Sequence, residues 1–132
     1  MTIQVQKNKP KLDAEYADRL AKALIKYAKK HNIKVELLTA ILMQESGYKV
    51  KAINHKSKDY GIGQINKKTI KNFKFDQDRI LSDVEYSVEA AAIVLADFKR
   101  MYGKREAQYW TRYNSSDKTK RQVYGKLVAR YL

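Results

Sequence analysis

The sequence has no cysteine and only two histidines among its 132 residues. Without cysteine, the chain can form neither a disulfide framework nor a thiolate metal site or nucleophile. His31 and His55 alone are too few for a multi-histidine metal centre. We therefore predict that the protein holds no metal ion and no cofactor.

Long apolar runs are missing as well. No segment approaches the roughly 18 apolar residues that a membrane-spanning helix needs. Residues 1–11 alternate polar and apolar side chains and carry three lysines, so they do not resemble a secretory signal peptide. A substrate outside the cytoplasm would then require another export route, or this sequence is a mature form.

Acidic residues are scarce, with 14 Asp and Glu against 28 Lys and Arg and a net charge of +14. Such an excess predicts attraction to nucleic acid, to acidic lipid or to an anionic cell-wall polymer. The charge is spread along the chain, and its densest clusters are Lys7–Lys11 and Lys118–Arg121. Neither a basic recognition helix nor an aromatic-basic sheet motif is present, so we do not expect nucleic acid as the partner.

What the chain does contain is enough apolar material for a core. Hydrophobic residues make up 44% of the sequence, and a chain of this length buries roughly two-thirds of its unfolded surface. We predict an N-terminal arm, residues 1–12, that ends near Pro10 with a possible short extended strand. A single domain, residues 13–132, follows it.

Spacing and capping residues predict a mainly helical α+β domain. Residues 48–65 lack helical periodicity, and we expect a loop there with a small β-hairpin whose last strand lies near Tyr60–Ile65. The capping box Ser82-Asp83-Val84-Glu85 is expected to start the longest helix, which ends at Gly103. Four other helices are predicted from Asp13 to Lys30, from Lys34 to Ser46, from Asn66 to Phe73 and from Lys104 to Tyr113, the last of them around Trp110. A final helix is predicted to begin at a Ser116 or Asp117 cap. Its inward-facing residues are expected to be Val123, Tyr124, Leu127, Val128 and Tyr131.

One acid lies on an apolar helix face. Leu38, Ile41, Leu42 and Glu45 stand at offsets 0, 3, 4 and 7, which is one side of a helix. A carboxylate on a face that should be buried is costly unless it has a partner or a use. Gly47 is expected to end the helix, which places Glu45 in the last turn. The alternative is an ordinary acid that forms a salt bridge.

Three short motifs follow one another along the chain: Glu45-Ser46-Gly47, Gly61-Ile62-Gly63-Gln64-Ile65-Asn66 and Tyr113-Asn114-Ser115. Together and in this order they resemble the lytic transglycosylase (SLT) domain of glycoside hydrolase family 23. The resemblance covers about residues 14–132 and implies a lysozyme-like fold, with a small β-hairpin beside the active-site groove.

The same resemblance implies an enzyme that cuts the glycan strand of peptidoglycan between N-acetylmuramic acid and N-acetylglucosamine. A glycosidic oxygen must be protonated as its bond breaks, which calls for a carboxyl whose pKa is raised by an apolar pocket. Glu45 fits that description. In the family this residue then takes the proton from the 6-hydroxyl of muramic acid, so that a 1,6-anhydro ring closes.

Further site residues are implied by the resemblance alone. Ser46 would orient Glu45, and the predicted substrate contacts are Ser57, Tyr60, Gln64, Tyr113 and Asn114. The alternatives are that Gln64 satisfies loop backbone and that Tyr113 packs in the core. Two positions depart from the family pattern: Arg112 stands where a small residue is frequent, and Gly63, which replaces a larger residue, is expected to leave the groove floor more open.

Asp59 immediately precedes Tyr60-Gly61, as does an aspartate in the corresponding strand of animal-type lysozymes and of some secretion-associated transglycosylases. In those lysozymes this Asp is the second carboxylate of a retaining hydrolase. A second carboxylate would also keep Glu45 protonated, because like charges resist double ionisation. Asp59 is thus either a catalytic partner of Glu45 or a turn residue.

Three functions follow in order of preference: a lytic transglycosylase, a hydrolytic muramidase that uses Glu45 and Asp59, and a non-catalytic cell-wall-binding protein. Neither a binding role nor a nucleic-acid role requires an acid on an apolar face. We expect a monomer that acts on the bacterial wall in the periplasm. The missing signal peptide favours a phage enzyme, either virion-associated or released from the host cytoplasm.

Overall fold

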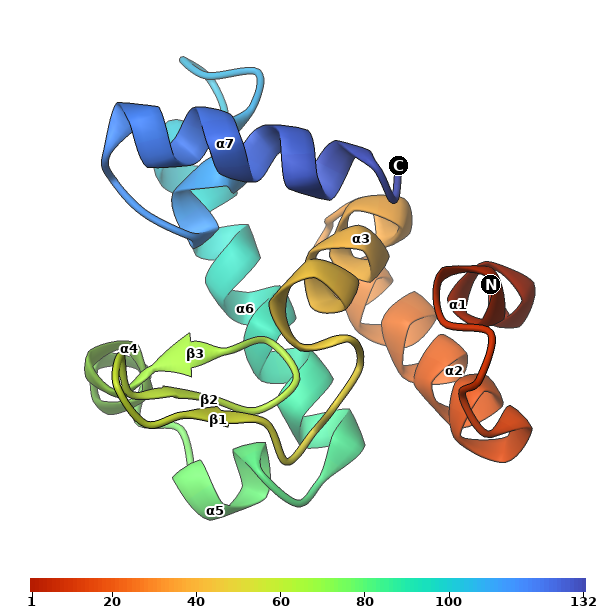
Figure 1. Ribbon diagram of the computed structural model, residues 1–132. Helices are drawn as coiled ribbons and strands as arrows, with labels where there is room; N and C mark the ends of the chain where they lie inside the picture. Colours follow the sequence, from red (N-terminus) through yellow and green to blue (C-terminus); the bar gives the residue numbers. More distant parts are fainter.

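Helices make up most of the chain, and a small sheet lies beside them (Figure 1). The computed structural model describes residues 1–132. This arrangement confirms the predicted α+β, predominantly helical fold. None of the helices combines the length and the apolar composition that crossing a membrane requires. The elements are α1 (Thr2–Asn8), α2 (Ala14–Lys30), α3 (Val35–Ser46), β1 (Ile53–Asn54), β2 (Asp59–Tyr60), β3 (Ile65–Asn66), α4 (Lys67–Phe73), α5 (Gln77–Ile80), α6 (Val84–Tyr102), the 3₁₀ helix η1 (Tyr109–Tyr113) and α7 (Lys118–Ala129).

Side-chain caps start three of these helices where the sequence predicts them. Asp13 and Asn66 accept hydrogen bonds from the first turns of α2 and α4, and Asp117, not Ser116, caps α7. At α6 the predicted capping box is wrong: Asp83 is the cap, and Glu85 forms an ion pair with Arg19 at 2.8 Å instead. Each such cap stabilises its helix by roughly 1 kcal/mol.

The N-terminal segment differs from the predicted extended strand. Residues Thr2–Asn8 form α1, whose Val5 is fully buried in the main core while Ile3 is 82% exposed. Lys9 Nζ donates to Gly47 O at 2.6 Å and so ties the segment to the end of α3. The polar-apolar alternation is also compatible with a short helix that buries one side chain, and contacts with distant residues decide between the two.

The helix predicted over Lys104–Tyr113 is wrong for its first half. Only η1 is helical there, although Trp110 is buried as expected. Residues 103–108 form a turn in which the backbone N–H of Glu106 donates to Tyr102 O. The Glu106 carboxyl is held by Arg112 and Arg121, at 2.6 and 3.4 Å, and these ion pairs favour the turn over a continued helix.

The core forms where α2, α3 and α6 meet, and α7 and η1 close it at one end. Small residues in α6, including Ala91 and Ala92, are buried against the neighbouring helices. One prediction for α7 is wrong: Val123, which was expected to face inward, is 55% exposed. The largest buried aliphatic side chains from α2, α3 and α6 are Leu20, Leu24, Leu38, Ile41, Leu42, Val88 and Leu95.

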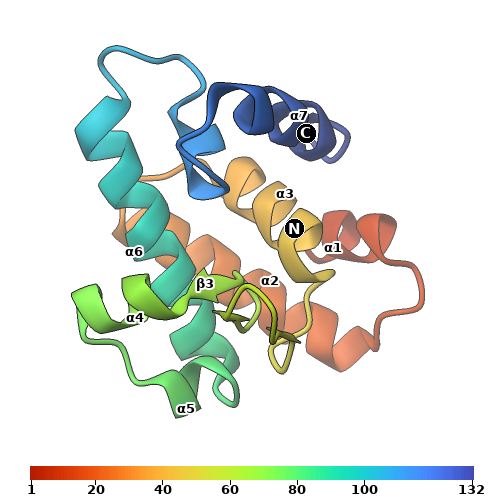
Figure 2. The same cartoon turned by 60° about the vertical axis from the view of Figure 1, so that its left-hand side comes forward.

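The sheet lies in the predicted region but has three strands rather than two. The single strand predicted near Tyr60–Ile65 is wrong, because residues 61–64 form the turn between β2 and β3. β1, β2 and β3 pair antiparallel in sequence order, and their register sets Asp59 opposite both Asn54 and Asn66. Figure 2 shows β3 and α4 side by side next to α6. The sheet thus presents Asp59 at one side of the helical core.

Gly125 lies in the interior of α7, where glycine costs more backbone entropy than alanine. A Cβ added there would lie 3.4 Å from Thr111 Cγ2 and 3.9 Å from Trp110, which are ordinary contacts. We expect Gly125→Ala to raise the free energy of unfolding by about 0.5–1 kcal/mol, measured by chemical denaturation.

Gly61→Ala is the matched opposite case. Gly61 has φ +81°, and its Cβ would lie 2.6 Å from Ile80 Cγ2 and 2.8 Å from Ile80 O. This substitution should therefore destabilise the protein. If Gly125→Ala destabilised it as well, the helical packing described for α7 would be wrong.

Candidate active site

Glu45 occupies the last turn of α3, after a run of buried side chains. Gly47 ends the helix in the left-handed conformation, with φ +61°, and its N–H donates to Met43 O at 2.9 Å. Glycine adopts this conformation without a steric penalty. The carboxyl of Glu45 therefore emerges at the end of the helix, where the chain turns towards the sheet.

The partly buried Glu45 carboxyl has a hydroxyl partner but no cationic one. Tyr124 from α7 donates its hydroxyl hydrogen to Glu45 Oε2 at 2.6 Å. No lysine or arginine forms an ion pair with Glu45, so the alternative of an ordinary salt-bridged acid is wrong. Burial raises the pKa of Glu45 to about 7, the Tyr124 hydrogen bond opposes that rise, and the charge of Asp59 adds to it. Near neutral pH the protonated and ionised forms are thus both well populated.

Ser46 connects this end of α3 to the second motif. Its hydroxyl donates to Ile62 O at 2.7 Å and accepts a hydrogen bond from Lys49 N at 3.2 Å. The side chain next to Glu45 thereby holds the loop that precedes β3. This is the location that an orienting role for Ser46 requires.

The expectation of an open groove floor at Gly63 is wrong. A Cβ on Gly63 would lie 2.5 Å from the Tyr113 hydroxyl and 2.8 Å from Ala91 Cβ. The Tyr113 hydroxyl donates to Gly63 O at 2.7 Å. Gly63 is small because Tyr113 and α6 occupy the space that a side chain would need. Burial, followed by the charges of Glu45 and Asp59, raises the pKa of Tyr113 well above its ordinary value.

Two hollows of about 310 Å³ each meet at Glu45. We call them the sheet-side hollow and the α7-side hollow. Both include Glu45 and Asn114 in their walls, so together they form a groove with the acid between its two halves. The sheet-side walls also contain Asp59, Gln64, Ile65, Asn66, Thr69, Val94, Phe98 and Tyr113. The α7-side walls also contain Gln44, Thr119, Lys120, Val123, Tyr124 and Leu127.

Asp59 lies in the sheet-side hollow with its carboxylate fixed by two donors. Ser57 Oγ donates to one oxygen at 2.6 Å, and Asn66 Nδ2 donates to the other at 3.1 Å. These contacts orient the carboxylate. The structure thus brings both predicted carboxylates into one hollow, although they come from α3 and β2.

The remaining predicted residues divide into two groups. Gln64 and Tyr113 line the sheet-side hollow, and Asn114 lines both hollows. Gln64 Nε2 also donates to Ala52 O and Gly61 O, so the residue supports loop backbone as well. Ser57 and Tyr60 line neither hollow: Ser57 contacts Asp59, and Tyr60 packs against the smaller core cluster.

Tyr124 is the site residue that the sequence analysis missed. Its position on an apolar helix face predicts a buried core residue, and it is buried. The Glu45 carboxyl to which the Tyr124 hydroxyl donates lies 79 positions away in the sequence, so no local sequence pattern could reveal the contact. The one available signal is a tyrosine among aliphatic positions, because a buried phenol requires a hydrogen-bond partner.

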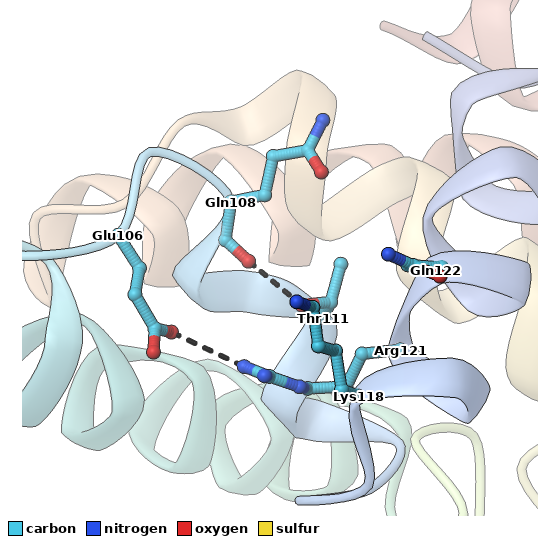
Figure 3. A pocket seen from close by; sticks show the side chains of 6 residues that line it. All are labelled: Glu106, Gln108, Thr111, Lys118, Arg121 and Gln122. Atoms are coloured by element: carbon cyan, nitrogen blue, oxygen red, sulfur yellow. Dashed lines mark hydrogen bonds and ion pairs between the residues drawn. The ribbon is translucent and has the colours of Figure 1, made fainter.

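Arg112, one of the two positions that depart from the family pattern, belongs to a polar cluster beside η1 that also contains Glu106 and Arg121. Arg112 forms a bidentate pair with Glu106 at 2.6 and 2.9 Å and stacks on Tyr102, with its guanidinium carbon 3.8 Å from the ring centre. Figure 3 shows Arg121 of α7 reaching the same Glu106. The cluster therefore joins η1, which leads to Asn114, to the helix that carries Tyr124, and Arg112 lines neither hollow.

Removing the Tyr124 hydroxyl should move the pH dependence of any reaction that needs protonated Glu45. The hydrogen bond favours the carboxylate, so Tyr124→Phe should raise the pKa of Glu45 further. We expect the fall in rate at high pH to shift upward by about one pH unit, since a hydrogen bond to a charged group contributes roughly 1.5–3 kcal/mol. The measurement is kcat/KM against pH.

Tyr16→Phe is the control for this variant, because it removes a tyrosine hydrogen bond, to Tyr48 O, that does not involve Glu45. Its pH profile should match that of the wild type. An unchanged profile for Tyr124→Phe would contradict the contact between Tyr124 and Glu45.

Comparison with known proteins gives a family and two partial relatives. The family model described as "Transglycosylase SLT domain" matches residues 22–127. The chain is 38% identical to "Protein IpgF" of Shigella flexneri over 85 residues, which are 60% of this chain and 56% of that protein. It is 40% identical to "Invasion protein IagB" of Salmonella typhimurium over 81 residues, 57% of this chain and 51% of that protein. The chain spans about half the length of these curated relatives.

The matched range includes α3 with Glu45, the three strands, α6, η1 and most of α7. It therefore contains every residue that lines the two hollows, together with all three motifs. Since the family model accounts for most of the sequence and for the whole groove, the chain belongs to the Transglycosylase SLT domain family.

Proposed function

We propose that this protein is a peptidoglycan lytic transglycosylase. It cleaves the β-1,4 bond between N-acetylmuramic acid and N-acetylglucosamine and leaves 1,6-anhydromuramic acid ends. The observation that carries the proposal is the carboxyl of Glu45, which lies between two hollows, has no cationic partner and has its pKa raised to about 7 by burial. A carboxyl of this kind can give up and take back a proton within one catalytic cycle.

In the first step, protonated Glu45 donates its proton to the glycosidic oxygen while the bond from C1 of muramic acid to that oxygen breaks. The electron pair stays with the departing N-acetylglucosamine hydroxyl. Positive charge develops at C1, where the neighbouring N-acetyl group stabilises it. Asp59, held by Ser57 and Asn66 in the same hollow, adds a fixed negative charge.

In the second step, the 6-hydroxyl of the same muramic acid attacks C1. The Glu45 carboxylate takes the proton that this hydroxyl loses, so the acid is restored and no water is consumed. The Tyr124 hydrogen bond stabilises the carboxylate between the two steps. Asn114, which lines both hollows, is a substrate contact on each side of the broken bond.

A hydrolytic muramidase is the second candidate, and the placement of Asp59 favours it. Both carboxylates line one hollow, as a retaining glycosidase requires of its acid and its nucleophile. In that reaction Asp59 bonds covalently to C1, and water later releases the sugar with a reducing end. The match to the SLT family favours the anhydro product.

Mass spectrometry of the products from purified peptidoglycan tests the proposal. The anhydro product is lighter than the reducing-end product by one water molecule. Anhydromuropeptides support the transglycosylase, whereas products dominated by reducing muramic acid ends overturn it in favour of the muramidase. Binding to the wall without any cleavage would leave the non-catalytic alternative.

A further inference from the structure

Half of the net charge of the chain is concentrated beside the sheet. Residues 49–74 contain eight lysines and a single acid, Asp59, which gives this segment a net charge of +7 out of +14. All eight lysines are exposed, and none forms an ion pair. Elsewhere on the surface some cations pair with acids, as Arg19 does with Glu85, and others such as Lys26 do not. The eight are Lys49, Lys51, Lys56, Lys58, Lys67, Lys68, Lys71 and Lys74.

Three of these lysines stand at the edge of the sheet-side hollow, and we call Lys58, Lys67 and Lys68 the lysine rim. Lys58 directly precedes Asp59 in the chain, and Lys68 directly precedes Thr69, and both of these neighbours line the hollow. The backbone N–H of Lys67 donates to Lys58 O at 2.9 Å, so the two come from adjacent segments. Figures 1 and 2 show the strands and α4 gathered on this side of α6.

The lysine rim does not stabilise the local fold. Lys67 and Lys68 occupy the first turn of α4, which contains no acid. Positive charge at a helix N-terminus interacts unfavourably with the helix dipole. Lys58 adopts a left-handed conformation, with φ +61°, that a non-glycine residue rarely takes. Lys67 and Lys68 thus lie where positive charge is unfavourable, and Lys58 adds a third unpaired cation beside them, so the anionic groups of a ligand would neutralise a local excess of positive charge.

We propose that the lysine rim binds the free carboxylates of the peptide stems on a peptidoglycan strand that lies in the sheet-side hollow. This inference rests on the function proposed above and names the part of the substrate that the rim recognises. The sugars themselves carry no free charge where the muramic acid lactyl group is bonded to a stem. The stems carry carboxylates and project away from the glycan, which is where exposed lysine side chains can reach them. Several weak ionic contacts raise the local concentration of a charged substrate.

Two triple variants with the same change in charge separate the lysine rim from the overall charge. The test variant is Lys58→Gln, Lys67→Gln and Lys68→Gln. The control is Lys26→Gln, Lys29→Gln and Lys34→Gln, three exposed lysines outside the segment that form no ion pair. Each protein is assayed on soluble glycan strands with intact stems and on the same strands after the stem carboxylates have been converted chemically to uncharged amides, which leaves the lactyl groups bonded to the stems. Both binding and kcat/KM are measured.

We expect the rim variant to lose roughly fivefold to tenfold in binding and kcat/KM on strands with charged stems and to match the wild type on strands whose stem carboxylates are amidated. The control variant should match the wild type on both. Raising the salt concentration should weaken wild-type binding to strands with stems more than that of the rim variant, because salt screens exposed charges.

Equal losses by the rim variant on both polymers, or the same loss by the control, would overturn the proposal. The proposal would also be overturned if the rim variant lost more binding to a stem-free phosphate polymer than to strands with stems, because the lysine rim would then be a general polyanion site. Failure of the proposed function would look different: the wild type would cleave neither strand. In that case the binding measurements would still decide the role of the lysine rim.

Discussion

Glu45→Gln is expected to lower the rate of glycan cleavage by at least about a hundredfold, because general acid catalysis typically contributes roughly 10²- to 10⁴-fold. Glutamine keeps the size of the side chain and can still accept the hydrogen bond from Tyr124, but it has no proton to give to the glycosidic oxygen. It also cannot take the proton of the 6-hydroxyl. The measurement is the rate of muropeptide release from purified peptidoglycan at pH 6 to 7.

The wild-type rate should itself fall as the pH rises through about 7, where Glu45 loses its proton. Stability should change in the same direction. The pKa of Glu45 is raised from 4.5 in a model peptide to about 7 in the folded protein, so the folded state binds the proton more tightly. The wild type therefore loses stability as the pH rises from 4.5 through 7. Glu45→Gln lacks this titration and should be at least as stable as the wild type at pH 8.

Glu36→Gln is the matched control, because Glu36 is exposed in the first turn of the same helix. It should retain nearly the full rate. If Glu45→Gln released products at close to the wild-type rate while folded, the assignment of Glu45 as the catalytic acid would be wrong.

Asp59→Asn is expected to slow cleavage by roughly tenfold or more, since a preorganised charge beside a developing cation contributes a few kcal/mol. Asparagine preserves the shape of the side chain, and its carbonyl oxygen can accept one of the hydrogen bonds from Ser57 and Asn66. What it removes is the negative charge in the sheet-side hollow. It also removes a charge that raises the pKa of Glu45, so the pH at which the rate falls should move downward.

The two enzyme mechanisms predict different outcomes for this variant. If Asp59 only stabilises charge, the slower variant still forms anhydro ends, because the 6-hydroxyl remains the nucleophile. If Asp59 forms a covalent intermediate, the variant loses most of its activity and the wild-type products carry reducing ends. Asp78→Asn, an exposed acid on α5, controls for the change of charge. A wild-type rate for Asp59→Asn would make Asp59 a turn residue.

Features encoded by neighbouring residues could be predicted from the sequence alone. A cap and the first turn it serves lie within three positions of each other, so Asp13, Asn66 and Asp117 could be recognised. The spacing of apolar residues on α3 and the glycine that ends it place Glu45 in the last turn. Helical periodicity and capping act over a few residues, and therefore they need no knowledge of the rest of the chain.

The surroundings of Glu45 depend on residues that meet only in the folded chain. Tyr124 donates to it from 79 positions away, and the Tyr113 hydroxyl occupies the space beside Gly63 from 50 positions away. The sequence of the N-terminal segment is compatible with a strand or with a helix. The helix α1 forms because it buries Val5 in the core. The sequence by itself determined most of the helices, their caps and the candidate acid, because those signals are local. Only the tertiary structure decided the partners of that acid, because burial and hydrogen bonding between distant segments depend on how the helices pack.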